Sequence, residues 1–222
     1  MRLRLFRPIE IDRAEALRYL RGGDGNEVAD DLERAISELH RALHPAAAAA
    51  VFALVPDGGM PTLGGLSLPG ASIARHLVGC ARCAILGVTL GFEVDRLIAA
   101  AGQLSPYRAL LLDACATAAV EDLADQAAGL LSEQLPDAQG RQTWRFSPGY
   151  GDLPLSLQPA LLERIDARRT LGLTVGSSLL LSPIKSVTAL IGLCEGDCAA
   201  EQPGCAACSM AARCPYRRAR KI

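Results

Sequence analysis

The pattern of predicted helices and strands favours an α+β fold, with mixed helices packed around an antiparallel sheet. Helical and strand-like segments follow one another without the regular β-α-β alternation of a doubly wound parallel sheet. Half of the 222 residues are hydrophobic and no segment repeats at a solenoid period, so one domain with a sizeable core is expected. Five of the eight cysteines fall near the C-terminus. We therefore divide the chain into a domain over residues 1–193 and a short Cys-rich tail over residues 194–222.

Capping residues and apolar periodicity predict the helices. Asp12 caps a helix over residues 12–21, and an apolar stripe at helical spacing follows over residues 26–43. Ser105 and Pro106 are typical of a helix start, and that helix is expected to continue to about residue 135. Shorter helices are predicted from residue 71 onward, over 93–101 and over 156–165.

Apolar runs bounded by turn residues predict the strands. These cover residues 83–90, 142–146, 173–181 and 187–193. Residues 46–55 fit a helix or a strand equally well, residues 56–59 form a turn signal, and the Gly/Pro-rich stretch 61–70 is expected to be a loop.

Composition excludes several functional classes. The formal net charge is −1 and only 4% of residues are aromatic, which argues against a nucleic-acid-binding surface. No apolar run is long enough for a membrane helix, and arginines are spread through residues 1–23, where a secretory signal would need an apolar segment. We expect a soluble, cytoplasmic protein whose cysteines are thiols, metal ligands or redox groups.

Common catalytic motifs are missing. The sequence has no phosphate-binding glycine loop of either common type and no nucleophile elbow. His40 and His44 are four residues apart on one predicted helix, but Arg41 stands where a zinc protease would have glutamate. The ordinary interpretation of this pair is a solvated helix face.

The most informative segment runs from Arg145 to Asp152. A predicted strand ends at an arginine, and Pro148, Gly149 and Tyr150 then form a turn that a ligand could approach closely. Arginine offers a planar fork for a carboxylate, and tyrosine offers a ring face and a hydroxyl. These groups suit a zwitterionic or cationic small molecule, although a tight turn with a surface arginine fits the same residues.

The pattern Arg-x-x-Pro-Gly-Tyr at 145–150, followed by Ser-Pro-Ile-Lys-Ser-Val-Thr at 182–188, resembles the activation (reactivation) domain of vitamin B12-dependent methionine synthase, in its short stand-alone form. Short matches at residues 11–12, 17–20, 68–70, 89–91, 94–96, 113 and 120–121 extend the resemblance over about residues 10–193. The resemblance implies an α+β domain that binds S-adenosylmethionine in a shallow groove and presents it to cobalamin held by another domain.

The resemblance also implies roles for individual residues. Arg145 would bind the methionine carboxylate, Ser147 and Gly149 would contribute backbone contacts within the Ser147-Pro148-Gly149 turn, and Tyr150 would lie against the ligand. Acidic residues of the long helix would face the ligand's ammonium group. Glu121 and Asp125 are four residues apart and could share a helix face, for which exposure to solvent is the alternative interpretation.

Two departures from the longer enzymes leave a ligand contact in doubt. Residues 175–177 read Val-Gly-Ser where those enzymes carry a Thr-Glu-Ser-like stretch, and the Cys-rich tail replaces their final aromatic segment. The chain also has no cobalamin-binding Asp-x-His-x-x-Gly. It would therefore be a component of the methyltransferase rather than a complete enzyme. The implied partner is a corrinoid-binding methionine synthase protein, with a flavodoxin or ferredoxin as a possible electron donor.

The spacing of the tail cysteines is typical of a thiolate-bound metal. Cys198, Cys205, Cys208 and Cys214 form the most compact set of four, and Cys194 is a spare or substitute ligand. An Fe–S cluster, a structural zinc ion and a set of free thiols all fit. Cys80 and Cys83 could form a redox pair, but buried thiols beside a strand fit as well.

Two other functions remain open from the sequence. One is a non-catalytic Fe–S or zinc module for electron transfer or protein interaction. The other is an activator of a different corrinoid methyltransferase.

Overall fold

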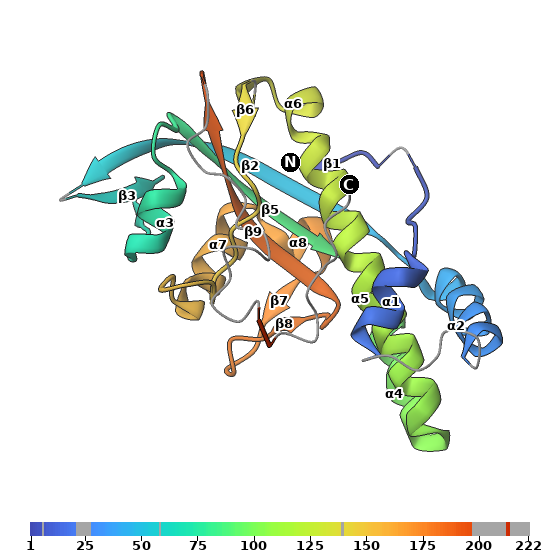
Figure 1. Cartoon of the computed structure of the whole chain (residues 1–222). Helices are drawn as coiled ribbons and strands as arrows, with labels where there is room; N and C mark the ends of the chain where they lie inside the picture. Colours follow the sequence, from blue (N-terminus) through green and yellow to red (C-terminus); the bar gives the residue numbers. More distant parts are fainter. Residues whose placement is uncertain (6, 21–27, 58, 139, 197–211, 214–222) are drawn as a thin grey trace.

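The computed structural model describes residues 1–5, 7–20, 28–57, 59–138, 140–196 and 212–213 (Figure 1). The strands are β1 (Arg2–Leu3), β2 (Ala46–Asp57), β3 (Met60–Leu63), β4 (Leu66–Ser67), β5 (Arg82–Thr89), β6 (Arg141–Gln142), β7 (Thr174–Val175), β8 (Leu181–Ser182) and β9 (Ser186–Cys194). The helices are α1 (Arg13–Tyr19), α2 (Ala29–Ala42), α3 (Ala71–His76), α4 (Phe92–Leu104), α5 (Pro106–Gly129), α6 (Leu131–Gln134), α7 (Gln158–Arg164) and α8 (Ala167–Leu171), with 3-10 turns at Pro136–Ala138 and Leu155–Leu157.

One antiparallel sheet organises the fold. Its strand order is β4-β3-β2-β5-β9-β6, with β1 paired to β2, and a separate hairpin joins β7 to β8. The central pair runs from Arg82 opposite Leu193 to Thr89 opposite Ser186. Long, buried β5 and β9 therefore form the rigid centre to which the other elements attach.

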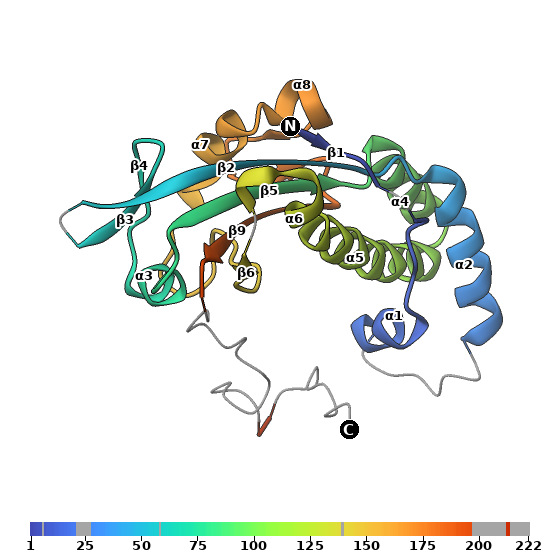
Figure 2. The same cartoon turned by 90° about the horizontal axis from the view of Figure 1, so that it is seen from above.

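Two hydrophobic clusters cover the two faces of this sheet. Alternate residues of β5 point to opposite sides, so Ala84 and Leu86 join one cluster while Cys83 and Ile85 join the other. The first cluster includes residues of α1, α2, α4 and α5, and the second includes residues of α3, α7 and α8. Figure 2 shows α5 and the α7–α8 pair on opposite sides of the sheet.

The predicted α+β architecture is confirmed, and most predicted helices lie within a few residues of their expected ends. The ambiguous segment 46–55 is strand β2, because β1 and β5 pair with it on its two sides. The segment predicted to be one helix to residue 135 instead ends at Gly129 and is followed by α6.

Three other predictions were wrong. Residues 61–70 are not simply a loop, because β3 and β4 form a hairpin there. Residues 173–181 are not one strand: β7 and β8 pair across a turn, and α8 precedes them without having been predicted. Residues 142–146 are not one continuous strand either: the backbone pairs with β9 at Gln142 and again, as an isolated bridge, at Phe146.

The end of β9 lies at the predicted boundary between domain and tail. Cys194 is its last residue and pairs with Arg141 of β6, so the sheet includes the first residue assigned to the tail. Among the described residues, none of the helices combines the length and hydrophobicity needed to cross a membrane.

Candidate functional site

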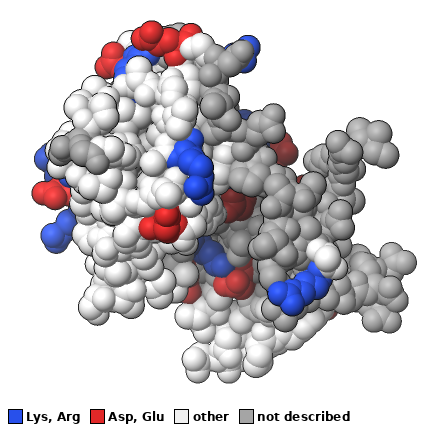
Figure 3. All heavy atoms as spheres, turned by 60° about the vertical axis from the view of Figure 1, so that its left-hand side comes forward, with Lys and Arg blue, Asp and Glu red and all other residues white. Residues whose placement is uncertain are grey.

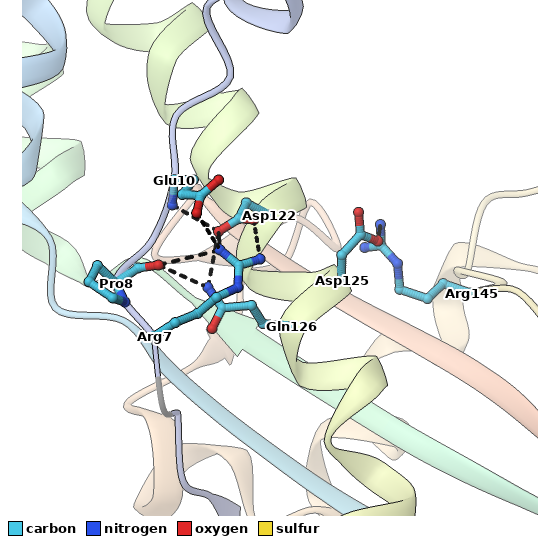
Figure 4. Close-up of polar contacts among 7 residues, drawn as sticks. All are labelled: Arg7, Pro8, Glu10, Asp122, Asp125, Gln126 and Arg145. Atoms are coloured by element: carbon cyan, nitrogen blue, oxygen red, sulfur yellow. Dashed lines mark hydrogen bonds and ion pairs between the residues drawn. The ribbon is translucent and has the colours of Figure 1, made fainter. Parts of the chain in front are cut away.

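Arg145 lies between two carboxylates of the long helix α5. Its Nη2 atom donates to Glu121 Oε2 at 2.7 Å and to Asp125 Oδ1 at 2.9 Å. The arginine side chain is 20% exposed, whereas those of Glu121 and Asp125 are 43% and 72% exposed. Figure 4 shows Asp125 and Arg145 pointing toward each other across the space between α5 and the neighbouring chain segment. Glu121 and Asp125, which were predicted to share a helix face, therefore both contact Arg145.

A third α5 carboxylate has a different task. Asp122 accepts from both terminal nitrogens of Arg7, at 2.6 and 3.2 Å, and from the Glu10 backbone N–H at 2.9 Å (Figure 4). Burial raises the pKa of Asp122, but the hydrogen bonds from Arg7, the Glu10 backbone and Gln126 outweigh that effect, and its pKa is lowered. Asp122 thus fastens the N-terminal segment to α5 and belongs to the framework around Arg145.

The turn after Arg145 is fixed by the sheet and by its own hydrogen bonds. Phe146 exchanges two backbone hydrogen bonds with Leu190 of β9, at 2.8 and 2.9 Å. Within the turn, the Tyr150 N–H donates to Ser147 O and the Gly149 N–H donates to Leu153 O. Gly149 has a φ of +92°, which favours glycine. A third hydrogen bond, from the Leu153 N–H to Tyr150 O, completes the turn, so its shape is set by its own backbone.

Side-chain exposure along the turn defines which parts are accessible. Pro148 is buried, Ser147 is half-buried, and Gly149 is exposed. Tyr150 is 50% exposed, and its ring meets that of Phe146 edge-on with centroids 5.9 Å apart. The tyrosine therefore offers an exposed ring that rests on a buried aromatic side chain.

Asp152 anchors the far end of the turn to α3. Its carboxylate accepts from the backbone N–H groups of Ala71 and Ser72, at 2.7 and 2.9 Å. These hydrogen bonds, the one from Ser72 first, lower its pKa. Gly151 fits because a Cβ there would lie 2.7 Å from Ser72 Oγ.

Lys185 extends the charged row along α5 and is not among the residues predicted for the site. Its Nζ lies 2.9 Å from Asp113 Oδ1 and donates to Thr117 Oγ1 at 2.9 Å. Residues 113, 117, 121 and 125 recur every four positions, so they line one face of α5 with cations at both ends. Two features of the sequence could have identified this row: Lys185 lies in the motif at 182–188, and residues 113, 117, 121 and 125 are spaced by four.

The second of the two predicted site types, a metal site, falls mostly outside the described residues. Cys198, Cys205, Cys208 and Cys214 lie there, while Cys194 lies at the end of β9. Within the part of the chain that the structure describes, no group of three His, Cys, Asp or Glu side chains could hold a metal ion. Metal binding by the tail stays a prediction.

Charged side chains are few and of both signs on the face shown in Figure 3. In the cluster around Arg145, one cation and two carboxylates lie within hydrogen-bonding distance of one another. A ligand that carries both a carboxylate and a cationic group could exchange with these internal ion pairs without leaving a charge unpaired.

Comparison with known proteins gives a structural likeness without a sequence relative. No family model matches the chain, and no curated protein matches it. The structure is similar to the crystal structure of the MetH reactivation domain bound to AdoHcy, with a TM-score of 0.61 and 16% identity. The match covers 83% of this chain and 70% of that one. The chain therefore has the fold of the MetH reactivation domain.

Proposed function

We propose that this chain binds S-adenosylmethionine at the Arg145 cluster and supports reductive methylation of cobalamin on a partner methionine synthase. The observation that carries the proposal is the position of Arg145 between Glu121 and Asp125, at the start of the turn that carries the exposed ring of Tyr150. The fold supports it, since the similar reactivation domain was solved with AdoHcy bound. The matching Arg-x-x-Pro-Gly-Tyr motif adds a sequence argument.

Charge balance favours this ligand over a simple carboxylate. Arg145 carries +1 and its two partners −1 each, so the cluster has a formal charge of −1. S-adenosylmethionine has one carboxylate, one ammonium and one sulfonium, for a net +1, and would neutralise the cluster. A carboxylate alone would pair with Arg145 but leave Glu121 and Asp125 without a cation, and it would add a third negative charge to the cluster.

The partner would supply the reaction centre. One electron and the methyl group of S-adenosylmethionine convert cob(II)alamin to methylcobalamin, leaving S-adenosylhomocysteine. This chain would hold the methyl donor and orient it, so its contribution is positioning and electrostatics. A flavodoxin or ferredoxin could donate the electron.

Isothermal titration with S-adenosylmethionine tests the ligand site. Arg145→Ala is expected to weaken binding about 10- to 100-fold, because a charge-assisted hydrogen bond of roughly 1.5–3 kcal/mol is lost. Arg169→Ala is the matched control: it removes the same charge from α8, where Arg169 pairs with Asp166 on the surface. Equal affinity of the Arg145 variant and the wild type would refute the site, and absence of binding to the wild type would refute the function.

A second experiment tests the partner. Candidate corrinoid proteins in the cob(II)alamin state are mixed with a reductant, S-adenosylmethionine and this chain, and the spectrum of methylcobalamin is followed. We expect methylation to need this chain when the partner is a methionine synthase without its own activation domain. Methylation of a different corrinoid methyltransferase instead would assign the chain to that system.

A further inference from the structure

The sulfur atoms of Cys80 and Cys194 are 3.0 Å apart, although 114 positions separate the two residues. Cys80 lies just before β5, and Cys194 ends β9. The Cys80-x-x-Cys83 spacing allowed either a redox pair or buried thiols beside a strand. The structure buries Cys83 completely within β5, where its thiol contacts the Ala84 carbonyl and burial raises its pKa to about 12.

The backbone holds the two sulfurs in this arrangement. Ala81 N–H donates to Leu193 O at 3.1 Å, which fixes the segment of Cys80 beside the end of β9. On the other side of β9, Cys194 pairs with Arg141. Gly192 provides the space, because a Cβ at that position would lie 2.5 Å from Cys80 Sγ. The neighbouring elements therefore set the position of both cysteines.

The two cysteines differ in their chemical state. Cys80 is a free, half-buried thiol, whereas Cys194 is disulfide-bonded and 1% exposed. Thiol–disulfide exchange requires a thiolate close to one sulfur of a disulfide. Burial raises the pKa of Cys80, so the thiolate is a minor species at neutral pH, and the 3.0 Å separation has to compensate for its low concentration.

We propose that Cys80 is the resolving thiol for Cys194, so that the two residues form a reversible disulfide where β9 ends. The Cys80 thiolate attacks Cys194 Sγ, the bond between Cys194 and its previous sulfur partner breaks, and that partner leaves as a thiolate. The leaving thiolate takes up a proton equivalent to the one that Cys80 lost, so this exchange involves no net oxidation.

Starting from two thiols, the oxidant is a low-molecular-weight disulfide such as oxidised glutathione. Cys194 first forms a mixed disulfide and releases one glutathione, and attack by Cys80 then releases the second. Two protein thiols are oxidised and one glutathione disulfide is reduced to two thiols.

Such a bond would have a defined effect on the chain. It would join the segment before β5 to the last residue of the sheet, at the start of the Cys-rich tail. Cys194 would then not be a metal ligand, which leaves Cys198, Cys205, Cys208 and Cys214, the set that sequence spacing already favours. The proposal does not depend on S-adenosylmethionine binding.

Peptide mapping tests the proposal on the full-length chain. Reduced protein is treated with oxidised glutathione, quenched in acid, alkylated, digested and analysed by mass spectrometry. The expected result is a linked peptide that joins Cys80 to Cys194 in the wild type and in the control Cys83→Ser. Cys80→Ser and Cys80→Ala should lose the linked peptide and leave Cys194 bonded to glutathione or to its other sulfur partner.

Other outcomes would overturn the assignment. If Cys194 of the wild type carries glutathione, or is linked to its other sulfur partner, to the same extent as in Cys80→Ser, then Cys80 is not the resolving thiol. A linked peptide between Cys80 and any other cysteine would also refute it. Since the wild-type map alone can give either result, the test does not rely on correct folding of the Cys80 variants.

Discussion

At the scale of single residues, neighbouring acids on α5 have different tasks because a helix turns by about 100° per residue. Glu121 and Asp125 meet Arg145, whereas Asp122 meets Arg7. The four-residue spacing allowed the first pair to be predicted to share a face. The identity of their partner could not be derived from that spacing, because Arg145 reaches α5 through its position beside β9.

This division predicts a selective effect of neutralising each acid. Asp125→Asn should weaken S-adenosylmethionine binding about 3- to 10-fold and bring its affinity closer to that for S-adenosylhomocysteine, because a carboxylate is lost beside the ligand's cationic groups. Asp122→Asn, on the same helix, should leave both affinities unchanged while the protein is folded. Titration of each variant with both ligands measures the difference, and equal losses in the two variants would contradict the assignment.

His76 is a second residue whose surroundings set a measurable property. It is 4% exposed, its Nε2 lies 2.8 Å from Thr143 Oγ1, and its Nδ1 has no partner among the described residues. Burial lowers the pKa of His76 to about 4, and a hydrogen bond with the Trp144 backbone opposes this shift only in part. The folded protein therefore favours neutral His76, whereas the unfolded chain binds a proton below about pH 6.5.

The sign of the pH effect follows from that difference. Between about pH 6.5 and pH 4 the unfolded state binds more protons, so the free energy of unfolding falls as the pH falls, by at most about 3 kcal/mol. His76→Gln should remove this part of the pH dependence, and His40→Gln, on the exposed face of α2, should not. Urea unfolding at several pH values measures the free energy of unfolding of each variant. If the wild type and His76→Gln gave identical pH profiles, His76 would not be the source of this pH dependence.

At the scale of elements, the sequence predicted the long helices better than the short strands. Capping by Asp12 and Ser105 is observed, because such caps depend on local residues. The β3–β4 hairpin was missed although Gly64 and Gly65, both with positive φ, form the two-residue loop that favours a hairpin. The local sequence of this hairpin therefore does contain a signal for its turn.

Other elements could not be decided locally. Alanine does not favour strands, yet residues 46–50 form part of β2 because β1 and β5 supply its hydrogen-bonding partners. Likewise, Cys80 lies near Cys83 in sequence but near Cys194 in space, because antiparallel pairing of β5 and β9 brings their ends together. Sequence spacing alone carries no information on such pairings.

Close packing of a strand against α8 gives a prediction for one glycine. A Cβ at Gly87 of β5 would lie 2.6 Å from Ile165 Cδ1 and 3.2 Å from Leu171 Cδ1. Gly87→Ala should therefore destabilise the protein by about 1–3 kcal/mol through overpacking. Gly102→Ala in α4, where the nearest atom would be 3.8 Å away, should be stabilising by about 0.5–1 kcal/mol. Denaturant unfolding measures the free energy of unfolding of both variants. If Gly87→Ala left this free energy unchanged, the side chains of Ile165 and Leu171 would have to move aside.

At the scale of the whole molecule, the two hydrophobic clusters depend on the same strands. β5 and β9 contribute alternate side chains to both clusters, so neither cluster can be lost while the other keeps its sheet face. The Arg145 site lies where these layers meet: Arg145 pairs with α5 of the first cluster, and the next residue, Phe146, belongs to the second. Ligand binding there should stabilise both layers together.

This arrangement predicts a single cooperative unfolding transition. Trp144, the only tryptophan of the sequence, packs against the cluster that includes α7 and α8, so its fluorescence reports on that side of the sheet. Far-UV circular dichroism is weighted toward the helices, of which α5 with 24 residues lies on the other side. The two signals should give the same midpoint on heating, and S-adenosylmethionine should raise both midpoints equally. If tryptophan fluorescence changed several degrees before the helical signal, the α7–α8 layer would unfold on its own, and the shared strands would not couple the two clusters.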